Sequence, residues 1–128
     1  MIGLISTIMP AIVGGNSCIA LASTSKPLAA VTLTEVLATS DLPGGVVNLL
    51  TGERKELIEQ FANHMDVNAT VYCGHDPAEL AAVRTKAAGN VKRAIAYDRG
   101  DWMSDATQSP YFILDTQEVK TTWHPVGV

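Results

Sequence analysis

Apolar positions in the first hundred residues fall into two alternating kinds of run. Longer runs space their apolar side chains at helical intervals. They predict helices at Ile2 to Val13, from Pro27 onward, at Glu53 to Asn63 and at Pro77 to Ala88. Shorter, almost continuous apolar runs separate these helices. They predict buried strands at Ser17 to Leu21, Val46 to Leu50, Thr70 to Cys73 and Ala94 to Tyr97.

Glycine and proline mark the ends of these elements. Gly14 and Gly15 follow the first helix and favour a helix stop, and Pro27 suits a first helical position. The segment Ser40 to Gly45 (SDLPGG) predicts a turn before the second strand. On the second helix the spacing predicts one apolar face, made of Leu28, Val31, Leu33, Val36 and Leu37.

Short strands that alternate with longer helices imply parallel strands joined by helical crossovers. We therefore predict one α/β domain with a Rossmann-like parallel sheet and flanking helices. The alternation breaks at Asp98 and is followed by a polar loop that contains Trp102. Beyond the loop, Pro110 to Leu114 and Gln117 to Trp123 are predicted to be extended, so that the domain carries an extended C-terminal β arm.

The composition fits a folded domain of 128 residues, 47% of them hydrophobic and 17% charged. The net charge of −4 argues against a nucleic-acid-binding surface, which needs an excess of lysine and arginine. The basic residues are also scattered, and their only adjacent pairs are Arg54-Lys55 and Lys92-Arg93.

The stretch from Met1 to Ser25 carries no charged side chain, and Ala20 to Ala22 has the small-residue pattern of an export cleavage site. However, no basic residue precedes this apolar run. Pro10 and the turn at Gly14 to Asn16 also divide it into pieces too short to span a bilayer. We therefore favour burial in the core of a cytoplasmic protein over export or membrane insertion.

The two cysteines, Cys18 and Cys73, lie inside apolar runs. A disulfide scaffold uses more cysteines in a shorter chain, so we expect two buried thiols in a reducing cytoplasm. The three histidines, His64, His75 and His124, have no metal-ligand spacing, and we expect no metal site.

Four segments resemble the coenzyme-binding domain of aldehyde dehydrogenases. They are Pro10 to Ser17 (PAIVGGNS), Pro27 to Gly52 (which contains LPGGVVN), His64 to His75 (HMDVNATVYCGH) and Asn90 to Asp101 (NVKRAIAYDRGD). They are similar to the family's PALAAGNT, its PPGVVN turn, its HMDI and FTGS segment, and its LKRVTLELGGK, in the same order and with similar spacing. The resemblance implies a partial coenzyme-binding domain over residues 1–101.

A fifth segment, Thr116 to Trp123 (TQEVKTTW), looks like the YTEVKTV tail of the same family, which forms a strand of its oligomerisation region. The resemblance implies that residues 102–128 are a loop and an extended arm of this kind. The implied oligomerisation residues are Glu118, Val119, Lys120, Thr121, Thr122 and Trp123. A complete family member carries its catalytic domain between the two regions, whereas this chain has only a few residues there.

Family members oxidise aldehydes with a cysteine nucleophile, a glutamate base and an asparagine that helps to hold the oxyanion. The resemblance places the nucleophile in the missing catalytic domain and the asparagine before the first residue of this chain. Tyr97 stands at the position of the glutamate. A phenol, with an ordinary pKa of about 10, is a poor base at neutral pH. We therefore assign no catalytic residue and expect the chain to be inactive alone.

The nucleotide site implied by the resemblance is also degenerate. The family's KPSE sequence contacts the adenosine ribose, and its match, Leu21 to Thr24, retains only Ser23. In the GSxxxG turn near the pyrophosphate, Gly74 is retained, His75 replaces the serine, and Glu79 replaces the second glycine. The candidate cofactor-binding residues are therefore Ser23, Gly74 and His75. Because two charged hydrogen bonds are lost, each of roughly 1.5–3 kcal/mol, NAD(P) is expected to bind weakly or not at all.

One further constellation stays open. Cys73, Gly74 and His75 follow a predicted parallel strand and precede a helix, which is where open α/β sheets bind ligands. A thiol near a helix N-terminus and a histidine could be reactive. The alternative, which we favour, is a buried Cys73 with a solvent-facing His75.

The sequence thus supports three hypotheses of function. The first is a truncated or degenerate member of the family with a structural or assembly role, either in a homo-oligomer or beside a full-length subunit. The second is one portion of a split NAD(P)-dependent aldehyde dehydrogenase, whose catalytic residues come from another chain. The third is a small nucleotide-binding module at Gly74 and His75.

Overall fold

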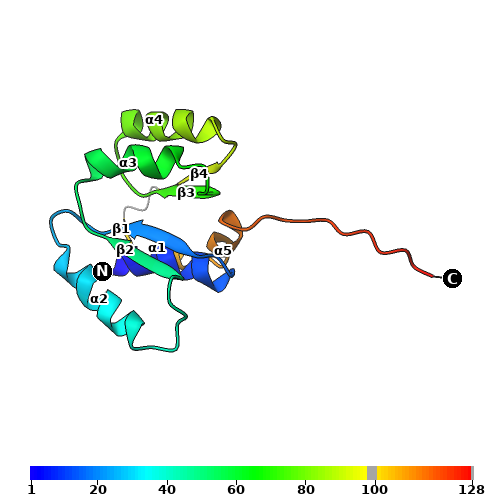
Figure 1. Ribbon diagram of the computed structural model, residues 1–128, viewed down its shortest axis with the longest axis horizontal. Coiled ribbons are helices and arrows are strands. Elements are labelled where there is room, and N and C mark those ends of the chain that lie inside the picture. Colours follow the sequence, from blue (N-terminus) through cyan, green and yellow to red (C-terminus); the bar gives the residue numbers. More distant parts are fainter. Residues whose placement is uncertain (98–100, 128) are drawn as a thin grey trace.

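The computed structural model describes residues 1–97 and 101–127 (Figure 1). Helices and strands alternate through the first part, as the sequence predicts, and each bound lies within one residue of its prediction. The elements are α1 (Ile2–Val13), β1 (Cys18–Leu21), α2 (Leu28–Ala38), β2 (Val47–Leu50), α3 (Arg54–Asn63), β3 (Ala69–Tyr72), α4 (Pro77–Ala88) and β4 (Arg93–Ala96). They are followed by a short 3₁₀ helix, η1 (Asp105–Gln108), and by α5 (Tyr111–Asp115).

The turns between these elements depend on a few residues with suitable backbone preferences. Gly15 follows α1 with φ of +86°, and Gly45 precedes β2 with φ of +85°. A residue with a Cβ rarely adopts this conformation, so both turns need glycine. Pro27 lies at the start of α2 with helical dihedral angles, as predicted.

The strands are parallel, which confirms the predicted α/β class with helical crossovers. β1 pairs with β2, with Cys18 opposite Val47, and β3 pairs with β4, with Ala69 opposite Arg93. Within the described residues these are two separate pairs and not one four-stranded sheet. The apolar pattern predicts that a helical crossover connects β1 to β2 and another connects β3 to β4. A single four-stranded sheet would also need backbone hydrogen bonds between β1 and β3, which are distant in sequence.

The fold therefore has two halves. In Figure 1, α3 and α4 lie side by side over β3 and β4, and β1 and β2 lie below them with α1 and α2. A buried cluster of Ala62, Tyr72 and Val83, with Ile58 and Leu80 packed against it, joins α3, β3 and α4. This cluster fixes the position of α4 relative to the end of β3.

The predicted apolar face of α2 is wrong in part. Ala30 is the buried residue of this helix, and Leu33 and Leu37 are half-buried. In contrast, Leu28 is 78% exposed and Val36 is 58% exposed. Because α2 packs chiefly on the narrow β1–β2 pair, it buries a thin stripe and leaves its other apolar side chains in solvent.

The prediction that Pro110 to Leu114 is extended is wrong, because this segment begins α5. The helix packs on α1, and Phe112 contacts Tyr97 with a distance of 5.2 Å between ring centroids. Trp102 lies against Gly3 of α1. As a helix packed on α1, this segment buries part of its apolar side chains, whereas an isolated extended segment would leave them in solvent.

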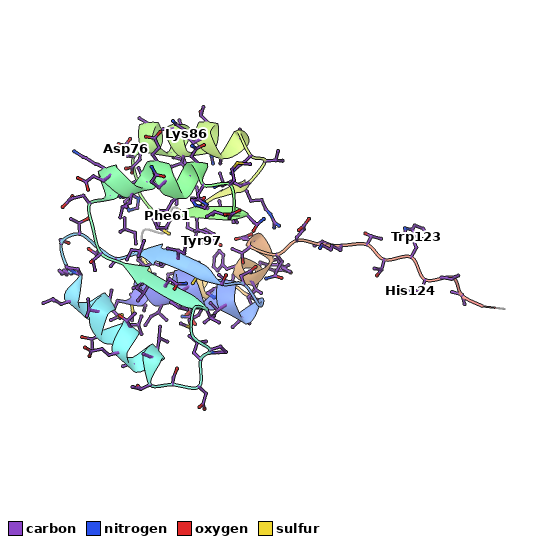
Figure 2. The ribbon with its side chains drawn as sticks, viewed as in Figure 1. Phe61, Asp76, Lys86, Tyr97, Trp123 and His124 are labelled. Carbon is purple, nitrogen blue, oxygen red and sulfur yellow. The ribbon has the colours of Figure 1, made fainter. Side chains whose placement is uncertain are left out.

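Beyond Gln117, residues 118–127 are exposed and extend away from the body of the molecule (Figure 2). They pair with no strand in the part of the chain that the structure describes. The predicted break at Asp98 and the last residue of the predicted arm, Val128, lie outside the described residues. None of the helices in residues 1–97 and 101–127 is long and apolar enough to cross a membrane.

Candidate functional site

The segment that follows β3 carries the polar residues that sequence analysis singled out. Tyr72 ends β3 with a buried side chain, and its ring lies directly against Gly74. A Cβ at position 74 would lie 2.3 Å from the Tyr72 hydroxyl oxygen, far inside van der Waals contact. The glycine is therefore needed to let the chain turn over the tyrosine ring.

The N-terminus of α4 is occupied by a carboxylate of the same chain. The Asp76 Oδ1 atom accepts hydrogen bonds from the backbone N–H groups of Ala78 and Glu79, at 2.9 and 3.3 Å. Pro77, at the first helical position, has no N–H to donate. The donors with which a helix N-terminus binds an anion are thus partly used by Asp76.

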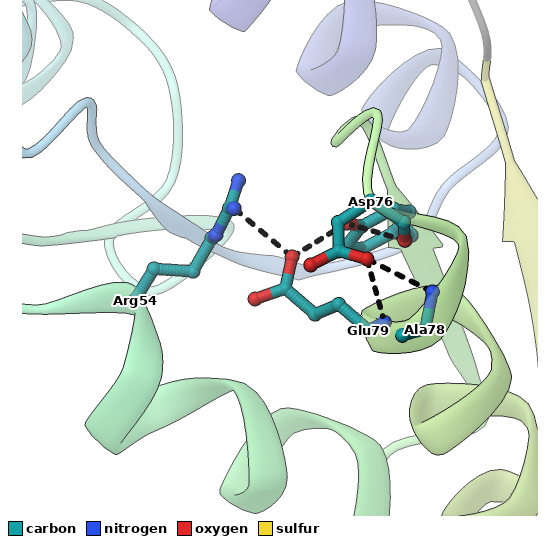
Figure 3. A network of polar contacts seen from close by, with 5 residues as sticks. Arg54, Asp76, Ala78 and Glu79 are labelled. Atoms are coloured by element: carbon teal, nitrogen blue, oxygen red, sulfur yellow. Dashed lines mark hydrogen bonds and ion pairs between the residues drawn. The ribbon is translucent and has the colours of Figure 1, made fainter.

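Glu79 places a second carboxylate at the same end of α4. Its Oε2 atom accepts a hydrogen bond of 2.5 Å from the Tyr72 hydroxyl and lies 3.0 Å from an Arg54 guanidinium nitrogen (Figure 3). The Glu79 side chain is only 17% exposed. The network joins the first residue of α3, the last of β3 and the first turn of α4.

This network changes the acidity of the tyrosine. Burial raises the pKa of Tyr72, and its hydrogen bond to Glu79 raises it further, because both disfavour the phenolate. The hydroxyl therefore stays protonated and acts as a donor. Arg54 and Tyr72 could not be identified from the sequence, since no spacing relates the start of α3 to the end of β3. The only signal was the acidic Glu79 in place of a glycine.

The three candidate cofactor residues lie in two segments, which follow strands of different pairs. Ser23 follows β1 and is exposed, with its Oγ atom 3.1 Å from that of Ser25. Gly74 and His75 follow β3, and His75 is exposed. Ser23 and Gly74 thus follow strands that are not paired with one another. Their role in cofactor binding stays a prediction.

Tyr97 follows β4 and is 8% exposed. Its hydroxyl donates a hydrogen bond of 2.9 Å to the Asp115 Oδ2 atom, and its ring meets the edge of Phe112 at an interplanar angle of 67°. Both partners belong to α5. Tyr97 therefore anchors the C-terminal helix, and its hydroxyl donates its hydrogen bond to a carboxylate of this chain.

Lys92 and Arg93 hold the start of β4 against neighbouring segments. Lys92 is buried, and its Nζ atom donates to the backbone oxygens of Phe61 and His64, at 3.2 and 2.7 Å, at the end of α3. Arg93 donates to the backbone oxygen of Gln117. Burial lowers the pKa of Lys92, because desolvation disfavours its charged form.

The expectation of two buried thiols is wrong for Cys73. This residue is exposed, with its Sγ atom 3.7 Å from the Thr7 Oγ1 atom, because it lies just beyond the end of β3. Cys18, within β1, is half-buried, and burial raises the pKa of its thiol. The two are not disulfide-bonded. Among the described residues, no group of three acidic, histidine or cysteine side chains could hold a metal ion.

Parallel strands with helical crossovers, and a glycine turn between a strand and a helix N-terminus, define a coenzyme-domain type of α/β fold. A family model for aldehyde dehydrogenases matches residues 1–100. The chain belongs to the aldehyde dehydrogenase family.

Individual relatives agree with this assignment. The chain is 31% identical to the NADP/NAD-dependent aldehyde dehydrogenase PuuC of Escherichia coli, over 66% of this chain and 17% of that protein. It is 29% identical to a betaine aldehyde dehydrogenase of Agrobacterium fabrum, over 88% of this chain and 21% of that protein. This chain thus spans about a fifth of the length of its curated relatives.

A solved structure shows the same fold. An aldehyde dehydrogenase from Bartonella henselae superposes with a TM-score of 0.67, at 24% identity, over 73% of this chain and 19% of that one. The likeness at this identity concerns the fold alone.

Proposed function

We propose that this chain is a degenerate aldehyde dehydrogenase domain, catalytically inactive by itself, with a structural or assembly role. The observation that carries the proposal is the state of Tyr97. At the position where the family has its general base, this chain has a buried phenol that donates to Asp115. A general base takes up a proton from the reacting water, whereas this hydroxyl still carries its own proton and donates it in a hydrogen bond to a carboxylate.

The arrangement at α4 supports the second part of the proposal, that NAD(P) binds weakly or not at all. A pyrophosphate that approached this helix N-terminus would meet the carboxylates of Asp76 and Glu79. Asp76 already accepts from two backbone donors, and Arg54 is already paired with Glu79. To bind here, a phosphate would have to displace both carboxylates, which breaks their hydrogen bonds, or lie beside them, which brings like charges together. Both alternatives are electrostatically unfavourable.

The exposed tail supports the assembly role. Residues 118–127 form no strand in the described chain, although they include β-favouring residues such as Val119, Thr121 and Trp123. An extended segment of this kind can satisfy its backbone groups by pairing with another chain. The partner would be a second copy of this chain or a full-length subunit of the family, in the cytoplasm.

The tail also gives the test. Because residues 110–117 are part of the folded body, the informative deletion begins at Glu118. We expect light scattering after size-exclusion chromatography to show an oligomer for the whole chain and a folded monomer for the deletion variant. Equal masses for the two proteins would refute the assembly role.

Activity and nucleotide binding are tested on the same purified chain. We expect no NAD(P)-dependent oxidation of short aliphatic or aromatic aldehydes, and no heat in calorimetry with NAD or NADP at millimolar concentration. Turnover by the unaccompanied chain would refute the proposal of inactivity. A saturable heat with adenine nucleotides would instead support a nucleotide-binding module.

The second candidate function is one portion of a split dehydrogenase. It is favoured by the finding that the chain spans about a fifth of its relatives, so that another polypeptide could supply the rest. That polypeptide would have to bring its own general base, because Tyr97 is held by α5. Co-purification with a second chain and aldehyde oxidation by the pair would support this candidate over the first.

A further inference from the structure

β1 and β3 each leave one edge without a neighbouring strand. On its paired edge, the β1 segment donates backbone hydrogen bonds of 2.8 Å from Cys18 and Ala22 to the β2 segment. Alternate residues of a strand turn their backbone N–H and C=O groups to opposite sides, so Ile19 and Leu21 turn theirs away from β2. In the described residues no backbone hydrogen bond joins either of them to another strand.

β3 has the same kind of open edge. On its paired edge, the backbone oxygens of Asn68 and Tyr72 accept hydrogen bonds of 3.1 and 2.9 Å from the β4 segment. Ala69 and Val71 alternate with the residues that face β4, and they turn their backbone groups to the other side. We call the open edges of β1 and β3 the inner edges.

The inner edges do not bond to each other. In Figure 1, β1 and β3 are the inner strands of the two pairs, with β2 below β1 and β4 above β3. Adjacent strands lie about 4.8 Å apart and pack along their length, as β1 does with β2. β1 and β3 share neither this packing nor a ladder in the part of the chain that the structure describes. They are therefore not adjacent strands of one sheet, and a strand between them could bond to both.

The surroundings of the inner edges are apolar. α1 contacts β1, and its Thr7 Oγ1 atom lies 3.7 Å from the Cys73 Sγ atom just beyond β3, so that the helix extends from one inner strand toward the other. None of the side chains of α1 is charged. On β1, Ile19 is 52% exposed, although parallel strands usually bury both faces. A strand that bonded here would contact apolar side chains and would itself have to be apolar.

The C-terminal tail of this chain does not have this character. In an extended tail Glu118, Lys120 and Thr122 lie on one face, and burial of the two charged side chains would be unfavourable. The apolar strands of a second copy are already paired within their own chain. The occupant that fits the inner edges is therefore an extended apolar segment of a different polypeptide.

We propose that such a segment inserts between β1 and β3 as a parallel strand and joins the two pairs into one sheet. The direction follows from the chain, because each pair is parallel and α3 connects β2 to β3 as a crossover helix. The backbone groups of the inner edges supply the affinity, and the apolar surroundings supply the selectivity. The inference rests on the proposed assembly role and adds a second surface to that of the tail.

The test uses a synthetic peptide in which a run of valine and isoleucine residues is flanked by lysines, which keep it in solution. The matched control peptide has one central proline, which removes a backbone donor and does not fit inside a sheet. Fluorescence anisotropy of the labelled peptides measures their dissociation constants with the whole chain. We expect saturable binding of the probe peptide and roughly tenfold weaker binding, or less, of the control. Equal affinities would overturn the inference.

Amide hydrogen exchange, measured by NMR, locates the bound peptide. In the chain alone the N–H groups of Ile19, Leu21 and Val71 should exchange fast, and the probe peptide should slow them roughly tenfold or more. Cys18 and Ala22 are the internal controls, because their N–H groups already bond to the β2 segment and should change little. Equal slowing at all five amides, or slow exchange at the first three before the peptide is added, would overturn the inference.

Cys73 reports the direction of the bound strand, since it is exposed and lies just beyond the carboxyl end of β3. A probe peptide with an activated disulfide at its carboxyl end should form a mixed disulfide with Cys73 roughly tenfold faster than one with this group at its amino end. Mass spectrometry measures both rates, and Cys73→Ser is the control for reaction at Cys18. Equal rates, or faster reaction from the amino end, would contradict a parallel strand.

The deletion that begins at Glu118 separates this inference from the proposed function. A monomeric deletion variant that still binds the probe peptide would support both. If the deletion leaves the mass unchanged while the peptide binds and protects the inner edges, assembly through the tail fails and the strand site stands. If the whole chain assembles through its tail but does not bind the peptide, the strand site fails alone.

Discussion

The contact between Tyr97 and Asp115 is expected to hold the C-terminal helix on the body of the molecule, and Tyr97→Phe isolates it. The substitution removes the hydroxyl that donates 2.9 Å to the Asp115 Oδ2 atom, and it leaves the aromatic ring in place. The edge contact with Phe112, at 5.2 Å, is therefore preserved. Any loss of stability then comes from the hydrogen bond and not from a cavity.

The magnitude follows from the charge and exposure of the acceptor. A hydrogen bond to a charged group contributes about 1.5–3 kcal/mol. Asp115 is half-buried, so that water can partly replace the lost hydroxyl, and we expect about 1–2 kcal/mol. For a chain of 128 residues this lowers the melting temperature by roughly 5 °C.

Urea and thermal unfolding, followed by circular dichroism, measure this loss. Tyr111→Phe is the matched control, because it removes the same hydroxyl from an α5 side chain that is 72% exposed. We expect a change within about 0.5 kcal/mol for the control. In a double-mutant cycle, Tyr97→Phe and Asp115→Ala should show a coupling on the order of 1 kcal/mol. Equal melting temperatures for the two tyrosine variants would refute the reasoning.

Three further predictions follow from other contacts. Gly74→Ala should lower the unfolding free energy by about 1–3 kcal/mol, because its Cβ would lie 2.3 Å from the Tyr72 hydroxyl oxygen. Gly44→Ala is the control, since a Cβ there has no neighbour within 4 Å and should leave the unfolding free energy nearly unchanged. Equal losses in urea unfolding would contradict this geometry. Cys73 is exposed and should react with a thiol reagent well before Cys18, because burial raises the pKa of the Cys18 thiol. Mass spectrometry of the labelled chain measures the two rates, and similar rates would contradict this prediction. Burial places the pKa of Lys92 in the folded chain below its unfolded value, so the unfolding free energy should rise with pH between the two values. Urea unfolding measured from pH 8 to 10.5 should show this rise for the unchanged chain and a smaller rise for Lys92→Met.

The sequence predicted the first eight elements because each of them is encoded locally. Apolar spacing, glycine turns and the prolines at Pro27 and Pro77 specify where a helix or strand begins and ends, without reference to the rest of the chain. The sequence also predicted that the Glu79 carboxylate lies in the first turn of α4, where we expect it to repel a phosphate. The family resemblance of residues 1–100 rests on the same local segments.

The errors all concern contacts between distant segments. Pro110 to Leu114 has a pattern that suits a strand, and it becomes a helix because Phe112 and Asp115 meet Tyr97. Cys73 lies in an apolar run, but its exposure depends on where β3 ends. Leu28 matches the helical spacing of α2 and is exposed, because the narrow β1–β2 pair covers only a stripe of the helix.

By itself, then, the sequence determined the order and type of the elements in the α/β part, and it predicted that the family's catalytic and cofactor-binding groups are missing. Only the tertiary structure decided which partners hold the residues that the resemblance places at two of those positions: Glu79 is joined to Arg54 and Tyr72, and Tyr97 is joined to Asp115. The physical reason is the range of the interactions. Propensity and periodicity act over a few neighbouring residues, whereas these hydrogen bonds and ion pairs form between separate elements once folding has brought them together.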